Sequence, residues 1–472
     1  MAAGSISAKR TEENTMLNGN GRAARLKVSA VFWILAATVT AGGQSPSRWT
    51  STAGAQVLLK TNSTQVGEAN SGLPTPLADL IEEAERHNPQ ILAARHGWKG
   101  ATQVPSQAST LPDPEIMVQQ FAVGSPRPFA GFTNSDFAYV GFGVSQDIPY
   151  PGKLRLRGEL AERDVAIARE HFEVVRRSMI EQVKATYFML AYERQELEIL
   201  AHDGKLLEQV AKIAEARYRV GQGNQQDVLK AQLEQTKILR DTATHQQQVG
   251  ILQAQLRQSL NRPANQPDVV PETLVDTPLN YTVDELLDRA RTANPDVLGQ
   301  SQMVRRNSLA VELARKDFYP DFNAQYMWQH TASQFRDYYM LTFGVRIPLY
   351  RSRRQQPELT QNVEELSRAR REYEAQVQQT FFELRDQFLE AETAERVLTM
   401  YREGLIPQAA AVFNAGLAAY GANREDFETL VNSFLDVLRL DEEYWRTLLG
   451  HETALARLEQ LTGIDLHARK EK

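Results

Sequence analysis

The chain contains an internal repeat whose two halves keep the same spacing. Ile148-Pro149 ends one alternating apolar segment, and Ile347-Pro348 ends another 199 residues later (148 to 347). A long charged segment follows each pair, and the turn beyond it carries Asp227 or Asp426, again 199 residues apart (227 to 426). Because both ends of the charged segments keep this spacing, the segments have equal length. The chain therefore predicts two copies of one structural unit.

The charged segments are predicted to be long helices. No proline occurs from Lys153 to Val220, and apolar residues recur there at steps of three and four, as in helix-packing seams. About 67 residues at 1.5 Å each give a helix of about 100 Å. Each long helix is expected to reverse at a turn rich in glycine and asparagine, which tolerate a left-handed conformation. The predicted long helices cover 153–220 and 353–419, the latter interrupted at Pro407; the return helices cover 225–261 and 424–462; shorter helices cover 78–87, 90–110, 283–293 and 296–319.

Four segments are predicted to be strands, at 115–123, 137–148, 321–330 and 338–347. Phe322, Tyr326 and Trp328 alternate with polar residues, which is typical of transmembrane β-strands. Alternation alone fits soluble, half-buried hairpins equally well, and 115–123 alternates poorly. Open strand edges are not tolerated in lipid, so four strands would need further copies to close. The sequence therefore predicts an obligate ring oligomer.

The N-terminal region predicts export. Arg22, Arg25 and Lys27 precede an apolar run of about 14 residues, too short for a membrane-spanning helix. Residues 1–41 are therefore interpreted as a signal peptide, with an uncleaved anchor as the alternative and Met16 as an alternative start. Residues 42–75, rich in Ser, Thr, Gly and Pro, are interpreted as a disordered tether. No later segment is apolar enough for a transmembrane helix, so any later membrane contact is expected through strands.

Composition excludes several classes of protein. The net charge of −6 lacks the excess of basic residues that is typical of nucleic-acid-binding proteins. The absence of cysteine excludes disulfides, thiolate metal sites and attachment through a lipidated cysteine. The eight histidines form no His-x-x-x-His pair, so no metal site is expected. No Gly-x-Ser-x-Gly, His-Glu-x-x-His or Walker-type motif occurs, so neither catalysis nor a cofactor is expected.

The duplication and the order of elements, together with two sequence blocks, resemble the TolC-type outer-membrane efflux family, most closely its heavy-metal branch of CzcC- and CusC-like proteins. The blocks are 146–157, which contains Ile-Pro-Tyr-Pro-Gly-Lys, and 218–229, which contains Gly-Gln-Gly-Asn. The resemblance covers about 73–463. It divides the chain into a first repeat at 76–270, a second at 271–463 and a tail at 464–472. The lack of a lipidated cysteine and the second turn, 419–423, depart from the family pattern.

The resemblance implies a mainly α fold with a small β part. Three chains would form a twelve-strand outer-membrane β-barrel that continues as a twelve-helix periplasmic barrel. A periplasmic adaptor and an inner-membrane RND-type pump would dock at the helical tips. The implied function is a passive efflux duct, with heavy-metal cations as one cargo. The alternatives are the duct of a type I protein secretion system and an exported coiled-coil scaffold without a channel.

Candidate functional residues lie at the two predicted helix reversals. The resemblance places an acidic constriction at Asp426, with Glu425 beside it, whereas a second acidic position of the family is occupied by Thr429. The alternative is that Asp426 only stabilises a helix N-terminus. The turns are candidate adaptor contacts, or ordinary reversals: Gly221, Gln222, Gly223 and Asn224 in the first, and Gly421, Ala422 and Asn423 in the second. Six basic residues follow the strands and are interpreted as solvated helix starts, with a place at the periplasmic membrane edge as the alternative: Lys153, Arg155, Arg157, Arg351, Arg353 and Arg354.

Overall fold

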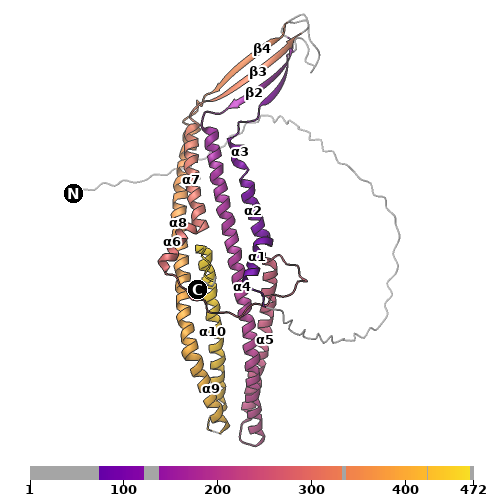
Figure 1. Cartoon of the computed structure of the whole chain (residues 1–472), viewed down its shortest axis with the longest axis vertical. Coiled ribbons are helices and arrows are strands. Elements are labelled where there is room, and N and C mark those ends of the chain that lie inside the picture. The colour runs from indigo at the N-terminus through magenta and orange to yellow at the C-terminus, as the bar shows by residue number, and fades with distance from the viewer. Residues whose placement is uncertain (1–73, 122–137, 332–335, 423, 468–472) are drawn as a thin grey trace, which may run out of the picture. The chain divides into compact units, whose positions relative to one another are not determined.

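The computed structural model describes residues 74–121, 138–331, 336–422 and 424–467. The predicted signal peptide and nearly all of the predicted tether lie outside these ranges. The described chain is mainly helical with one small sheet, as Figure 1 shows. This confirms the predicted mainly α fold with a small β part.

The long helices form two antiparallel hairpins. Helix α4 (Lys153–Arg219) returns as α5 (Gln225–Ser259). In the second repeat, α8 (Gln355–Met400), a five-residue π-helix η1 (Tyr401–Leu405) and α9 (Ile406–Gly421) form the outgoing arm, and α10 (Phe427–Thr462) returns. Pro407 lies in the first turn of α9, where its missing N–H is tolerated. The wide π turn before it joins the two helices without ending the arm.

Five shorter helices pack beside the long ones: α1 (Leu77–His87), α2 (Pro89–Ala101), α3 (Val104–Ser109), α6 (Val283–Ala293) and α7 (Pro295–Lys316). The single helix predicted for 90–110 is wrong, because the chain turns at Thr102 and Gln103 between α2 and α3. Pro105 explains the break: proline is tolerated in the first turn of a new helix but not in the interior of a continuous one.

The duplication is visible in two equivalent asparagine caps. The Asn88 carboxamide oxygen accepts from the Gln90 backbone N–H at 2.8 Å, and its amide donates to the Ser259 carbonyl at 2.8 Å. In the second repeat, Asn294 accepts from the Val297 N–H and donates to the Leu461 carbonyl, both at 3.1 Å. Both asparagines are buried. Each therefore starts a short-helix segment and fastens it to the end of the return helix of its own repeat.

The four strands form one antiparallel sheet in the order β1-β2-β3-β4. They are β1 (Glu115–Phe121), β2 (Tyr139–Ile148), β3 (Asp321–Thr331) and β4 (Tyr338–Arg346). Strand β2 pairs with β3, so the central pair joins the two repeats. Residues 122 and 123 of the first predicted strand lie outside the described residues.

A buried lysine connects the sheet to the helices. Lys153, the first residue of α4, places its Nζ 2.9 Å from carboxylate oxygens of both Asp317 and Asp321. Its side chain is only 4% exposed, which corrects its interpretation as part of a solvated helix start. Arg155, Arg157, Arg351, Arg353 and Arg354 are exposed. The link ties α4 to the end of α7 and the start of β3.

Buried apolar side chains of the described residues follow the helices in three clusters rather than forming one central core. One lies midway along the hairpins around Leu190, Leu256 and Leu448. A second lies toward the tips around Leu207 and Phe434, and a third packs α6 against α8 and α10.

Within the described ranges, no helix has both the length and the apolar character needed to cross a membrane.

Candidate functional site at the hairpin tips and the sheet

The first tip is a tight reversal with a left-handed glycine. Gly221 has φ 73°, and the Gln222 N–H donates to the Arg217 carbonyl at 2.8 Å. A side chain at Gly223 would lie 3.2 Å from the Arg217 Cβ, so the second glycine permits close approach of the chain. Gln222 and Asn224 are exposed. The turn therefore presents polar groups at the end of the hairpin, beside the reversal of the second repeat (Figure 1).

The second tip places its glycine inside the helix that ends there. Gly421 is the last residue of α9 and does not have a positive φ. The helix ends instead with hydrogen bonds from the Ala422 N–H to Ala418 and from the Arg424 N–H to Ala419. These bonds satisfy carbonyl groups in the last turn of α9. Asn423 lies outside the described residues.

An arginine that the sequence analysis did not single out joins the two tips. Arg217 of α4 donates to the Tyr420 carbonyl at 2.6 Å and to the Gln222 carbonyl at 3.3 Å. Its guanidinium carbon lies 4.2 Å from the centroid of the Tyr420 ring, in cation–π geometry. Tyr420 is 2% exposed and packs on Phe427. The contact therefore anchors the ends of α4 and α9 to one another.

The two predicted constriction residues have different environments. Asp426 is the exposed N-cap of α10, and its carboxylate accepts from the Thr429 backbone N–H at 2.7 Å. This hydrogen bond holds the pKa of Asp426 below its ordinary value. Glu425 is half-buried and its carboxylate lies beside Gly416 of α9. Nearby, Lys230 of α5 and Glu428 of α10 form an ion pair at 2.8 Å, a second link between the tips.

Above the tips, a buried carboxylate lies where α4 meets α5 and α10. Glu196 is 3% exposed, and its Oε1 has no hydrogen-bond partner among the described residues. Burial, followed by repulsion from Glu442, raises the pKa of Glu196 to about 7. Tyr192 and His245 lower it by smaller amounts. The seam between the two repeats therefore carries a carboxylate that titrates near neutral pH.

A second ionic cluster fastens the end of the described chain. His467 lies 2.7 Å from a Glu459 oxygen and 3.0 Å from a Glu452 oxygen. Burial lowers the pKa of His467, but the two carboxylates outweigh it and raise the pKa to about 9. Burial raises the pKa of Glu459, but His467 and Lys184 outweigh it and hold the pKa at about 2.

Glu459, His467 and Asp465 are close enough to share one ion. However, Glu459 already pairs with Lys184 and His467. We therefore interpret the cluster as an ionic clamp between α10 and α4.

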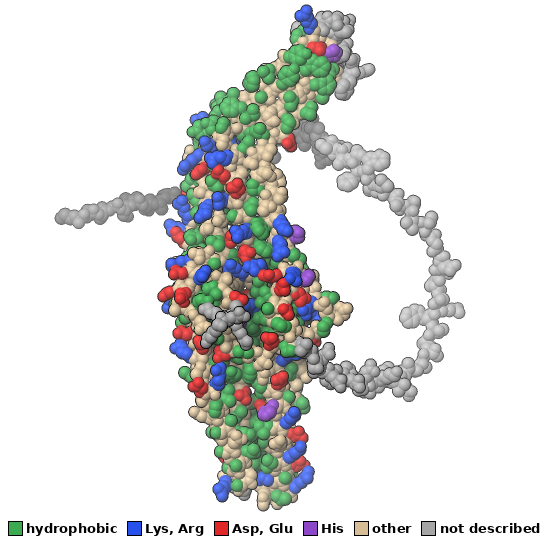
Figure 2. All heavy atoms as spheres, viewed as in Figure 1, with side chains coloured by type: hydrophobic (Ala, Val, Ile, Leu, Met, Phe, Trp, Pro, Cys, Tyr) green, Lys and Arg blue, Asp and Glu red, His purple; other side chains and the backbone are tan. Residues whose placement is uncertain are grey.

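The sheet has two chemically different faces. Apolar side chains on one face are largely exposed, and Figure 2 shows hydrophobic atoms gathered over the sheet, whereas charged side chains are scattered among other atoms over the helices. The exposed fractions include 81% for Ile116, 61% for Leu341 and 74% for Phe343. Phe142 stacks on Trp328 across β2 and β3, with centroids 6.1 Å apart. An exposed apolar face of this extent marks a membrane or protein contact.

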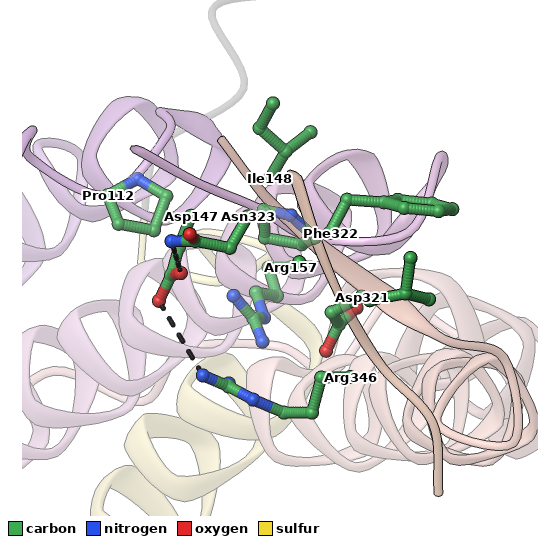
Figure 3. A pocket seen from close by; sticks show the side chains of 11 residues that line it. Pro112, Asp147, Ile148, Arg157, Asp321, Phe322, Asn323 and Arg346 are labelled. Carbon is green, nitrogen blue, oxygen red and sulfur yellow. Dashed lines mark hydrogen bonds and ion pairs between the residues drawn. The ribbon is translucent and has the colours of Figure 1, made fainter. Parts of the chain in front are cut away.

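The polar face ends in a hollow where the strands meet the helices (Figure 3). The cavity has a volume of about 370 Å³. Asn323 donates to Asp147 at 2.8 Å, and Arg346 lies 4.0 Å from the same carboxylate. Arg157 of α4 also lines the hollow. Charges of both signs therefore line the joint between the sheet and the helical hairpins.

The sequence and the fold together define the class of protein. The model of the family described as outer membrane efflux protein matches residues 80–262 and 286–422, more than half of the chain. The chain therefore belongs to the outer membrane efflux protein family. A search of curated protein sequences finds no match.

Solved structures share the fold at low sequence identity. The outer-membrane channel OprN superposes with a TM-score of 0.72 and 15% identity, over 83% of this chain and 90% of that chain. CusC superposes with a TM-score of 0.70 and 14% identity, over 83% of this chain and 92% of CusC. The outer membrane protein VceC from Vibrio cholerae superposes with a TM-score of 0.70 and 16% identity, over 82% of this chain and 96% of VceC. The likeness covers both the long helical hairpins and the sheet.

Proposed function

We propose that the protein is the outer-membrane duct of a tripartite efflux system. The observation that carries this proposal is a four-stranded sheet with an exposed apolar face, in which, among the described residues, β1 and β4 each pair with a single neighbouring strand. Such a face is stable against lipid, but unpaired edges are not tolerated there. Three copies would supply twelve strands, an even number within the range of closed barrels. Two or four copies would also give an even number of strands, so the need for closure supports a ring of copies, and the number three is what the family resemblance implies.

The helical hairpins would continue the barrel as a periplasmic tunnel. Helix α4 has 67 residues and is therefore about 100 Å long, several times the thickness of a bilayer. Three chains would contribute twelve helical arms around a common axis. Cargo would be delivered by an inner-membrane RND-type pump and a periplasmic adaptor, and would leave without chemical change.

We place the gate and the adaptor contacts at the tips. Three copies of Asp426, with Glu425 beside each, would form an acidic ring, a known device for selecting cations. The contacts of Arg217 with Tyr420 would hold each protomer's two hairpins together in the closed state. The turns at Gly221–Asn224 and Gly421–Asn423 would meet the adaptor.

Heavy-metal cations are the cargo that we propose, on the strength of the Ile-Pro-Tyr-Pro-Gly-Lys block at 148–153. The structural matches do not select a cargo, because OprN, CusC and VceC all lie at 14 to 16% identity. Loss of the gene in its host should sensitise the cells to zinc, cadmium, cobalt or copper salts. Sensitivity to organic drugs alone, or failure to secrete a protein, would contradict the metal proposal.

The duct itself is tested by purifying the protein from outer membranes in detergent. We expect a trimer by mass measurement and stepwise ion currents in a planar lipid bilayer. A monomer without conductance would contradict the duct and favour a scaffold.

A further inference from the structure

Three of the nine methionines lie in one cross-strand row of the sheet. Met117 of β1 is opposite Gly143 of β2, Gly143 is opposite Met327 of β3, and Met327 is opposite Met340 of β4. Directly opposite residues project from the same face of a sheet. The three thioethers therefore share one face. It is the polar face, whose neighbouring row holds Ser145, Gln325 and Thr342.

The glycines of β2 let one methionine lean across the sheet. A Cβ added at Gly141 would lie 3.2 Å from the Met327 sulfur, and one added at Gly143 would lie 3.3 Å from the Met327 terminal methyl. The Met327 side chain therefore reaches from β3 over the glycines of β2. Its sulfur accepts one hydrogen bond, from the Gln329 side chain at 3.5 Å.

Met117 is within reach of this sulfur. Neighbouring strands are about 4.8 Å apart, so a sulfur above β2 is about one strand spacing from β1. Met117 is half-buried, and its unbranched side chain has three rotatable bonds. Its side chain can therefore extend toward the Met327 thioether, whose sulfur lies beside Gly141 and whose methyl lies beside Gly143. Met340 lies on the other side of β3, so Met327 leans away from it.

We propose that Met117 and Met327 form a two-thioether binding site for a soft monovalent cation, Cu(I) or Ag(I), with Met340 in a minor role. Thioethers are soft ligands that favour such ions over hard cations. A flexible side chain that fills the gap above the glycines explains Met327. It does not explain why the two other residues of this row that carry side chains, Met117 and Met340, are also methionines. The site lies within one chain. That it faces the lumen of a duct rests on the proposed function.

The test uses Ag(I) and the purified protein in chloride-free detergent buffer. Because the chain has no cysteine, silver–sulfur scattering in X-ray absorption spectra can come only from methionine. We expect a sulfur shell around bound silver. Met117→Leu and Met327→Leu should each weaken binding by at least about tenfold, and Met340→Leu should weaken it less. Met400→Leu is the matched control, because Met400 lies in α8 and is 62% exposed; its binding should equal wild type.

Leucine conserves the side-chain volume, so the variants should fold. Wild-type protein gives an independent measurement: Ag(I) should protect Met117 and Met327, but not Met400, from oxidation by peroxide. Unchanged binding in the Met117→Leu/Met327→Leu double variant, or silver with only nitrogen and oxygen neighbours, would overturn the site. Conducting channels that bind no silver would overturn this inference alone. Silver binding without conductance would overturn the duct instead.

Discussion

The Arg217 guanidinium lies over the Tyr420 ring, 4.2 Å from its centroid, and donates to the Tyr420 carbonyl. Lysine cannot donate two directed hydrogen bonds and stack in the same way. We therefore expect Arg217→Lys to loosen the tips and to raise the open probability of single channels severalfold. Arg219→Lys is the control, because Arg219 forms only an exposed pair with Glu215. Equal open probability in both variants would show that the contact does not hold the gate closed.

Asp426 combines a helix cap with a negative charge, and two substitutions separate these roles. Asparagine caps a helix N-terminus as well as aspartate does but carries no charge, whereas alanine does neither. If the charge selects cations, Asp426→Asn and Asp426→Ala should both weaken the block of current by multivalent cations. Asp227→Asn at the equivalent position of the first repeat should not. If the block of current by multivalent cations changes only in Asp426→Ala, the effect belongs to the helix N-cap and not to the charge.

Glu196 makes the seam between α4 and α10 sensitive to pH. Its pKa is raised from 4.5 to about 7, so the folded state binds more protons between these values. Stability should therefore fall as pH rises from about 4.5 to 7 and should change little above 7. Glu196→Gln removes the buried charge and should stabilise the protein at pH 8 by roughly 2 to 3 kcal/mol.

Circular dichroism should be used to measure the unfolding of the wild-type protein and the Glu196→Gln variant in detergent at pH 4 and at pH 8. Glu198→Gln on the exposed side of the same helix is the control. A stabilisation by Glu196→Gln that is equally large at pH 4 would assign the effect to packing rather than to ionisation.

The ion pairs of His467 stabilise its charged form, whereas the surroundings of Glu196 destabilise the charged form of that residue. The pKa of His467 is raised from 6.5 to about 9, so its contribution is complete below pH 6.5 and is lost as pH rises through 9. Glu459 contributes above pH 4.5 and loses its contribution as pH falls toward 2. His467→Gln should therefore cost roughly 2 to 3 kcal/mol at pH 6 and much less at pH 10. His87→Gln, at an exposed site in α1, should show no such difference between thermal scans at the two pH values.

Much of the fold follows from local sequence patterns. The absence of proline from Lys153 to Val220 and the helical spacing of apolar residues predict a helix that the structure shows as α4. Alternation of apolar and polar residues predicts β3 and β4, because side chains of a strand point to opposite faces in turn. The single helix predicted for 90–110 failed because Pro105 can begin a helix but cannot lie inside one.

Tertiary structure alone decides which distant residues meet. Arg217 and Tyr420 are 203 residues apart, and no local pattern marks them as partners. The methionine row depends on the register of three strand pairs, which a shift of one residue would move to the other face. Glu196 is one of many glutamates on a charged helix, and its pKa is raised by burial between the helices and by the nearby Glu442, both of which tertiary packing decides. Sequence thus determined the elements through local periodicity, whereas packing between elements decided the contacts, the burial and the ionisation that a function requires.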